Sequence, residues 1–161
     1  MKQSIVEVIV YLLEMTATTT FEATDSSCGQ HFIQQRLEDA GFNEEVVTQA
    51  FDWLRELIEQ QSWYVDTKLD DNENRTFRVF SSEERARISM EVRGFILSLE
   101  HAGVLDTKMR EIVISQLMQL DERVVELIDA KWVVLLALMS NSNKNVKDIR
   151  RYLLATMELK E

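Results

Sequence analysis

Cys28 and His31 are separated by two residues, which is the spacing of one half of a zinc site. A closed structural zinc site needs four ligands, and His101 is the one other histidine or cysteine in the chain. Carboxylates would have to complete the coordination shell. We therefore expect no metal, and we interpret Cys28 and His31 as a partly exposed pair near the start of a helix.

A second group of potential ligands imitates the opening of a calcium-binding EF-hand loop. Asp70, Asn72 and Asn74 have the spacing of its first three ligands. The sixth position is Arg75 instead of glycine, and the twelfth is Ser81 instead of glutamate. This pattern indicates a solvated turn rather than a calcium site.

The usual catalytic motifs are missing from the sequence. It contains no glycine-rich phosphate loop, no serine nucleophile elbow, and no histidine or cysteine beside a plausible relay. Carboxylates that folding brings together remain an open route to catalysis. We expect no catalytic residue and no cofactor, and an enzyme is the third-ranked function.

The strongest basic cluster lies near the C-terminus and comprises Lys144, Lys147, Arg150 and Arg151, opposed only by Asp148. On a helix these side chains spread along one side. Two interpretations stay open: a solvated face that complements the acidic N-terminal half, or a surface for phosphate or an acidic partner. This cluster is the candidate anion-facing surface.

The charge balance disfavours a protein that acts mainly on polyphosphate or anionic lipid, because 18 basic residues face 28 acidic ones. Residues 1–73 hold 4 basic and 15 acidic side chains, whereas residues 74–161 hold 14 and 13. Any anion-binding surface is thus expected in the second half.

The elements that position these residues should be helices. The chain has no proline and four glycines, so few residues can interrupt a helix. Ser81 and Glu84 form a capping box that predicts one helix from about residue 82 to Gly103. Gly94 lies inside that helix, where it costs about 1 kcal/mol against alanine. We expect a close neighbour there, most simply a packed helix of the same chain.

In the first half, residues 5–13 predict a buried helix and residues 16–20 a connector. A second helix should end at Gly41, and Asn43 should cap a third. Residues 63–65 and 76–80 are rich in β-favouring side chains and predict a hairpin. Helix, helix-turn-helix and hairpin together predict a winged-helix-like acidic unit over residues 1–80. Asn43, Glu44 and Glu45 would repel phosphates, so such a unit should dock protein instead of DNA.

The second half should be a helical bundle over residues 81–161, which could also form one compact domain with the first half. Asp106 should cap a helix, and helices are expected over residues 121–128, 132–139 and 146–157. Lys131 and Trp132 begin the most apolar of these, with Lys131 reaching to solvent. Residues 37–43 and 99–106 resemble each other, either through duplication or through repeated use of a glycine stop. The fold class is mainly α.

Several strings together resemble the bacterial Smg family, in order and spacing: VYLLE (10–14), LEDAGF (37–42), RGF (93–95), VL (104–105), REIVI (110–114), LD (120–121) and DAKWV (129–133). The resemblance implies a cytoplasmic bacterial protein of uncharacterised function and carries over no catalytic or ligand residue. The charged, glycine and tryptophan positions within these strings are expected to be mostly structural: Arg93, Gly94, Arg110, Glu111, Lys131 and Trp132.

The location and the function class follow by elimination. A single cysteine and the lack of a clear signal peptide favour a reducing compartment, and no apolar run reaches the roughly 20 residues of a membrane span. We expect a non-enzymatic adaptor that binds a protein partner. The alternative is a nucleic-acid accessory protein that uses the basic second half, with weak or indirect nucleic-acid contact.

Overall fold

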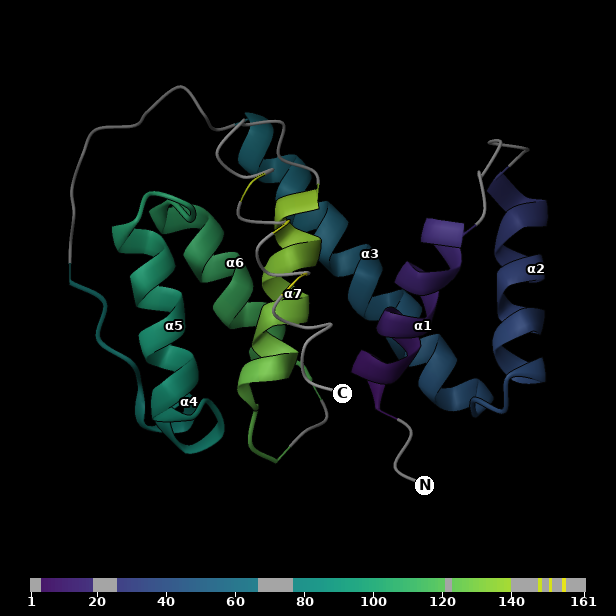
Figure 1. The fold of residues 1–161 in the computed structure, drawn as a ribbon, viewed down its shortest axis with the longest axis horizontal. Helices are drawn as coiled ribbons and strands as arrows, with labels where there is room; N and C mark the ends of the chain where they lie inside the picture. Colours follow the sequence, from purple (N-terminus) through teal and green to yellow (C-terminus); the bar gives the residue numbers. More distant parts are fainter. Residues whose placement is uncertain are drawn as a thin grey trace. The chain divides into compact units, whose positions relative to one another are not determined.

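The computed structural model describes residues 4–18, 26–66, 77–120 and 123–139, and the single positions 148, 151 and 155. Within these residues the chain is mainly helical, as predicted, and contains no strand (Figure 1). The helices are α1 (Ile5–Thr18), α2 (Ser26–Asp39), α3 (Glu44–Asp66), α4 (Ser82–Arg87), α5 (Met90–His101), α6 (Thr107–Met118) and α7 (Leu127–Met139).

The chain divides into two compact units, Met1–Arg55 and Glu56–Glu161, and the division falls inside α3. Unit 1 contains α1, α2 and the first half of α3. Ser4 and Glu7 cap α1 reciprocally through two backbone-to-side-chain hydrogen bonds of 3.2 and 3.3 Å. The core of this unit consists of apolar side chains from all three helices: Ile5, Val6, Val8, Ile9, Leu37, Val47, Ala50 and Trp53. The boundary near residue 80 that the sequence suggests stays a prediction.

The predicted helix over residues 5–13 is confirmed, with Ile5, Val6, Val8 and Ile9 buried and residues 10–13 half-buried, but α1 continues to Thr18. The expected connector therefore begins at least three residues too early, and residues 19–25 lie outside the described part. Threonine disfavours a helix only weakly, so an established helix can continue through it.

The two glycine stops are confirmed, and they have the same geometry. Gly41 and Gly103 have φ values of 94° and 75°, which glycine adopts without the strain of a side chain. After each glycine, the next amide donates to the carbonyl five residues earlier, at 3.1 and 2.9 Å. Asn43 and Asp106 then cap the following helices with their side chains. Both resembling strings thus contain the same glycine stop, and duplication stays a prediction.

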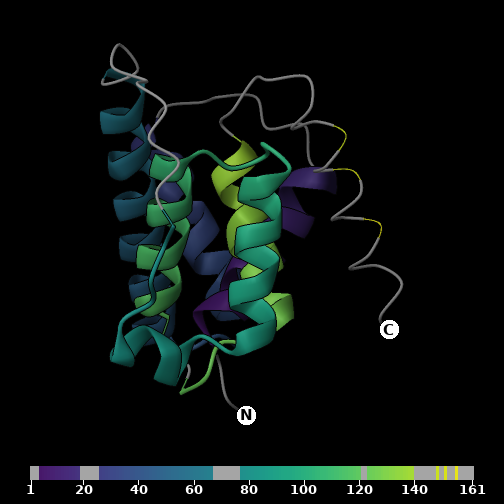
Figure 2. The same cartoon turned by 90° about the vertical axis from the view of Figure 1, so that its left-hand side faces the viewer.

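The predicted winged helix is wrong in its hairpin. Residues 63–65 belong to α3, and residues 77–80 belong to no helix or strand, although the chain runs drawn out there (Figure 2). No glycine or proline stands between Asn43 and Asp66, so nothing interrupts the helix before its β-favouring end. The described residues of unit 1 therefore form helices joined by the turn at residues 40–43, without a strand. The expected turn at residues 70–74 lies outside them.

Unit 2 contains the second half of α3 and the helices α4 to α7. The capping box of Ser81 and Glu84 is confirmed, yet the predicted single helix from residue 82 to Gly103 is interrupted after Arg87. Ile88 is extended and forms an isolated parallel bridge with Val125. The Ser89 side chain then accepts a hydrogen bond from the amide of Val92 and begins α5 as a new helix. A serine that caps a helix better than it continues one causes the break.

The core of unit 2 forms where α5, α6 and α7 pack on one another (Figures 1 and 2). Asp106 caps α6 as predicted, and the apolar stripe below it is buried: Met109, Val113, Leu117 and Leu120. The predicted helix over residues 121–128 is wrong for residues 123–126, where Val125 forms the bridge instead. The apolar run of α7 is buried as expected. None of the described helices has the length and apolar character to span a membrane.

Candidate functional site

An extended segment, residues 77–80, leads into α4 and alternates between outward and inward side chains. Phe77 and Val79 are 101% and 82% exposed, whereas Phe80 is buried and Arg78 is largely covered. This alternation is typical of a strand, in which successive side chains point to opposite faces. No hydrogen bond joins the backbone of the 77–80 segment to another backbone segment within the described residues.

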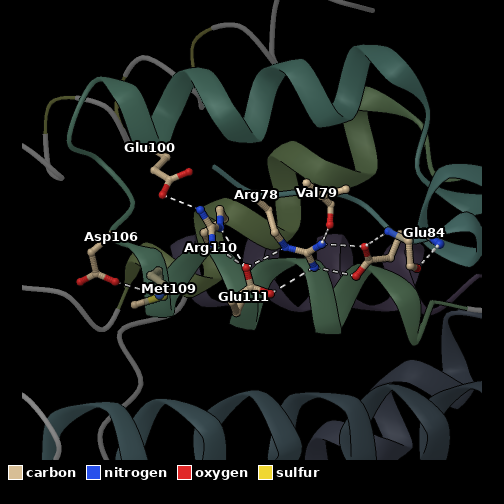
Figure 3. Close-up of polar contacts among 9 residues, drawn as sticks. Arg78, Val79, Glu84, Glu100, Asp106, Met109, Arg110 and Glu111 are labelled. Carbon is tan, nitrogen blue, oxygen red and sulfur yellow. Dashed lines mark hydrogen bonds and ion pairs between the residues drawn. The ribbon is translucent and has the colours of Figure 1, made fainter. Parts of the chain in front are cut away.

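Arg78 fixes this segment to the rest of unit 2 (Figure 3). Its guanidinium donates to both carboxylate oxygens of Glu84, at 2.7 and 2.8 Å, and to those of Glu111, at 2.9 and 3.2 Å. It also donates to the carbonyl of Val79 at 2.6 Å and lies 5.0 Å from the centre of the Phe80 ring. Planar two-point contacts of this kind are a property of arginine that lysine lacks.

The hydrogen bonds from Arg78 lower the pKa of the Glu84 carboxyl below its ordinary value, because they favour the ionised form. The same bonds to Glu84, together with those to Glu111, raise the pKa of Arg78. Both groups therefore keep their charge at neutral pH. Such a pair neither supplies nor takes up protons readily, so its geometry serves structure better than acid–base chemistry.

Arg110 extends the network into the interior of unit 2. Its side chain is 4% exposed and makes ion pairs with Glu100 of α5 at 2.6 Å and with the neighbouring Glu111 at 2.8 Å (Figure 3). Burial acts to lower the pKa of Arg110, but the hydrogen bonds to Glu100 and Glu111 outweigh it and the pKa is raised. Glu111 thus joins the two arginines, and the network connects the 77–80 segment, α4, α5 and α6.

A groove runs between the second half of α3 and α6, within unit 2. Its volume is about 510 Å³, and it is lined by three carboxylates with polar and apolar neighbours: Glu56, Glu59, Gln60, Glu111, Ile112 and Ser115. Glu56 accepts a hydrogen bond from Gln60 of the same helix at 3.2 Å. It also accepts one at 2.6 Å from Gln119, at the C-terminal end of α6, and this second bond connects α3 to α6. Glu111 borders the groove and also contacts Arg78, so the groove adjoins the 77–80 segment. We call these two features together the docking surface.

The remaining family positions have other surroundings. The Arg93 guanidinium lies 5.7 Å from the centre of the Phe80 ring, on the α5 side of the network. Gly94 is exposed, and nothing in the described part of the chain lies within 4 Å of the point where a Cβ would stand. The close neighbour expected at Gly94 is therefore not found there. Lys131 and Trp132 are half-buried on the first turns of α7.

Most of the predicted anion-facing surface lies outside the described residues, because Lys144, Lys147 and Arg150 are not among them. Arg151 is helical and exposed. Of the possible zinc pair, Cys28 lies on α2, and His31 is exposed on the same helix. Across the residues that the structure describes, no three histidine, cysteine or acidic side chains are placed to hold a metal ion.

The sequence interpretation missed Arg78, Glu84 and Glu100 as members of one network. The sequence predicts Glu84 only as part of the capping box, and Arg78 only as part of the hairpin. Their partners are up to 33 residues away along the chain, so local spacing does not reveal them. One signal was available for Arg110, which shares a helix face with the buried Ile114 and Leu117.

Comparison with known proteins agrees with the resemblance seen in the sequence. Residues 5–158 match a family described as "Protein of unknown function (DUF494)". A Protein Smg homolog of Methylococcus capsulatus is 36% identical over 91% of this chain and 88% of the relative, and one of Alkalilimnicola ehrlichii is 39% identical over 87% and 85%. One of Vibrio cholerae is 32% identical over 94% and 95%. No solved structure matches the chain. The chain belongs to the Smg family of proteins of uncharacterised function.

Proposed function

We propose that the protein is a non-enzymatic cytoplasmic adaptor that docks onto a protein partner through the docking surface. The exposure of Phe77 and Val79 carries this proposal. An isolated apolar side chain at the surface is common, but two neighbours on an extended segment form a contact strip. Aromatic and branched apolar residues of this kind supply much of the energy at protein interfaces.

The contacts that hold the 77–80 segment in place support a role in binding. Phe80 anchors it in the core, and Arg78 makes five hydrogen bonds to Glu84, Glu111 and the Val79 carbonyl. Since the segment is already ordered, binding a partner costs less conformational entropy than ordering a loose loop would. The charged groups around it are engaged in ion pairs, which leaves apolar contact as its main means of recognition.

The proposal is tested by affinity capture from native lysate with the full chain immobilised, with and without nuclease. We expect the natural chain to capture a protein partner whether or not nuclease is added. The Phe77→Ser/Val79→Ser variant should no longer capture it. Phe32→Ser is the matched control, because Phe32 is an exposed aromatic residue of unit 1, 54% exposed, and should leave capture unchanged. Equal capture by both variants, or loss of all capture after nuclease treatment, contradicts the proposal.

A nucleic-acid accessory role is the second candidate. Positions 148, 151 and 155 are helical and exposed, as the predicted basic helix requires. On that helix Lys147 and Arg151 would lie on the same face. Reversing both to glutamate should reduce nuclease-sensitive capture and leave nuclease-resistant capture intact if this surface binds nucleic acid.

A further inference from the structure

We infer that the partner presents an extended, basic and apolar peptide segment, which lies along the 77–80 segment and places lysine or arginine side chains in the adjoining acidic groove. This inference rests on the proposed docking function and specifies the chemistry of the partner.

The backbone of the 77–80 segment defines the shape of what it binds. It runs drawn out in Figure 2, and no other backbone segment within the described residues pairs with it. An extended peptide can add alongside such a segment, with backbone hydrogen bonds providing affinity and alternate side chains providing specificity. Phe77 and Val79 lie two positions apart on the exposed face, so the partner needs apolar residues at the same alternate spacing.

The groove defines the charge of the partner. Glu56, Glu59 and Glu111 line it, and the Glu111 side chain remains 46% exposed although it pairs with two arginines. Its outline includes three carboxylates and no basic residue. A lysine or arginine side chain from the partner therefore meets complementary charge there, whereas an acidic segment is repelled.

The two features are continuous, which is why one segment can use both. Glu111 contacts Arg78 at 2.9 Å and borders the groove. Figure 2 shows the segment descending beside α6 toward α4. A peptide that pairs with the 77–80 segment thus has the groove within reach of its longer side chains.

A second copy of this chain fits the surface less well. It would bring the same three carboxylates and a net charge of −10 to the interface. Pairing two four-residue segments would also bury far less than the roughly 1,200 Å² of a small stable interface. Charge complementarity therefore favours a basic partner over self-association.

Three synthetic peptides test the inference by fluorescence anisotropy with the full chain: one alternates valine and lysine, one valine and glutamate, and one serine and lysine. We expect the valine–lysine peptide to bind at least about tenfold more tightly than the other two. Its affinity should fall on raising the salt from about 0.15 M to about 1 M, where the screening length drops from roughly 8 to 3 Å.

Two variants separate the apolar and the charged contributions. Phe77→Ser/Val79→Ser should lower the affinity for the valine–lysine peptide by about tenfold or more. Glu56→Gln/Glu59→Gln keeps the shape of both side chains and removes two of the three groove charges, so it should weaken binding about fivefold and reduce the salt dependence. Phe32→Ser is again the control, and unchanged thermal melts should show that each variant is folded.

The outcomes distinguish this inference from the function on which it rests. One outcome is that lysate capture depends on Phe77 and Val79 while the valine–lysine and valine–glutamate peptides bind equally tightly. In that case the inferred basic character of the partner is wrong, and the docking function stands. If the Glu56→Gln/Glu59→Gln variant binds the valine–lysine peptide as tightly as the natural chain, the groove takes no part and the inference fails. A dimer in solution that Phe77→Ser/Val79→Ser dissolves would overturn it in favour of a second copy.

Discussion

Replacing Arg78 with methionine should destabilise the protein far more than replacing an ordinary surface arginine. Methionine keeps much of the aliphatic stem but removes the guanidinium that joins the 77–80 segment to α4 and α6. Breaking a fully buried ion pair costs about 3–5 kcal/mol, and an exposed pair contributes about 0–1 kcal/mol. The Arg78 and Glu84 side chains are each 16% exposed, which places them closer to the buried limit.

Two contacts reduce the expected cost. Glu84 keeps its hydrogen bond from the Ser81 amide at 2.8 Å, and Glu111 keeps its ion pair with Arg110. We therefore expect Arg78→Met to lower the free energy of unfolding by about 2–3 kcal/mol. For a chain of this length, that corresponds to a fall in Tm of about 5–10 °C.

The assay is urea unfolding followed by circular dichroism, with Arg55→Met as the matched control. Arg55 pairs with Asp52 at 3.1 Å, but these side chains are 62% and 63% exposed, so its loss should cost less than about 0.5 kcal/mol. A double-mutant cycle of Arg78→Met with Glu84→Gln should give a coupling energy of about 1–3 kcal/mol. If the two methionine variants differ by less than about 0.5 kcal/mol, the network does not stabilise the fold and the reasoning is refuted.

The remaining predictions concern pH, glycine and metal. The pKa of Glu84 is depressed in the folded state, so its stabilising effect is present above the unfolded pKa of about 4.3 and is lost as the pH falls through the folded pKa. The stability difference between the natural chain and Glu84→Gln should therefore shrink as the pH falls below about 4.3 in urea titrations. Gly94→Ala should stabilise the protein by about 0.5–1 kcal/mol, since Gly94 lies within the helix α5 and no described atom lies within 4 Å of the added Cβ. Gly103→Ala should destabilise the protein by about 1 kcal/mol, because Gly103 has a positive φ. Thermal melts that show the opposite order would contradict this. Chelation with EDTA should leave the melting curve unchanged, and a large fall together with stoichiometric zinc would mean that Cys28 and His31 bind metal after all.

Signals that act over a few residues were predictable from the sequence. Ser81, Asn43 and Asp106 are predictable as caps, and Gly41 and Gly103 as stops, because these hydrogen bonds and backbone angles depend on neighbours two to five positions away. The apolar stripe of α6 and the buried run of α7 followed from helical periodicity in the same way.

Errors arose where tertiary contacts decide between two acceptable local structures. Residues 63–65 favour a strand, but no partner strand is present within the described residues and the preceding helix continues through them. Ile88 fits the apolar stripe of one long helix, yet the bridge to Val125 and the cap at Ser89 separate α4 from α5. In each case the sequence allowed both outcomes, and contacts distant in the chain selected one.

The docking surface could not be predicted because it is what remains after the charges of unit 2 have paired. By sequence alone, Arg78 is one residue of a predicted hairpin, and Arg110 is a family position expected to be structural. In the structure their guanidiniums are engaged with Glu84, Glu100 and Glu111, so neither is free to bind phosphate. Pairing removes the positive charge from this face and leaves apolar side chains and partly exposed carboxylates at the surface. A partner that recognises this face must therefore be complementary to carboxylates and apolar groups, which favours a basic protein segment over nucleic acid.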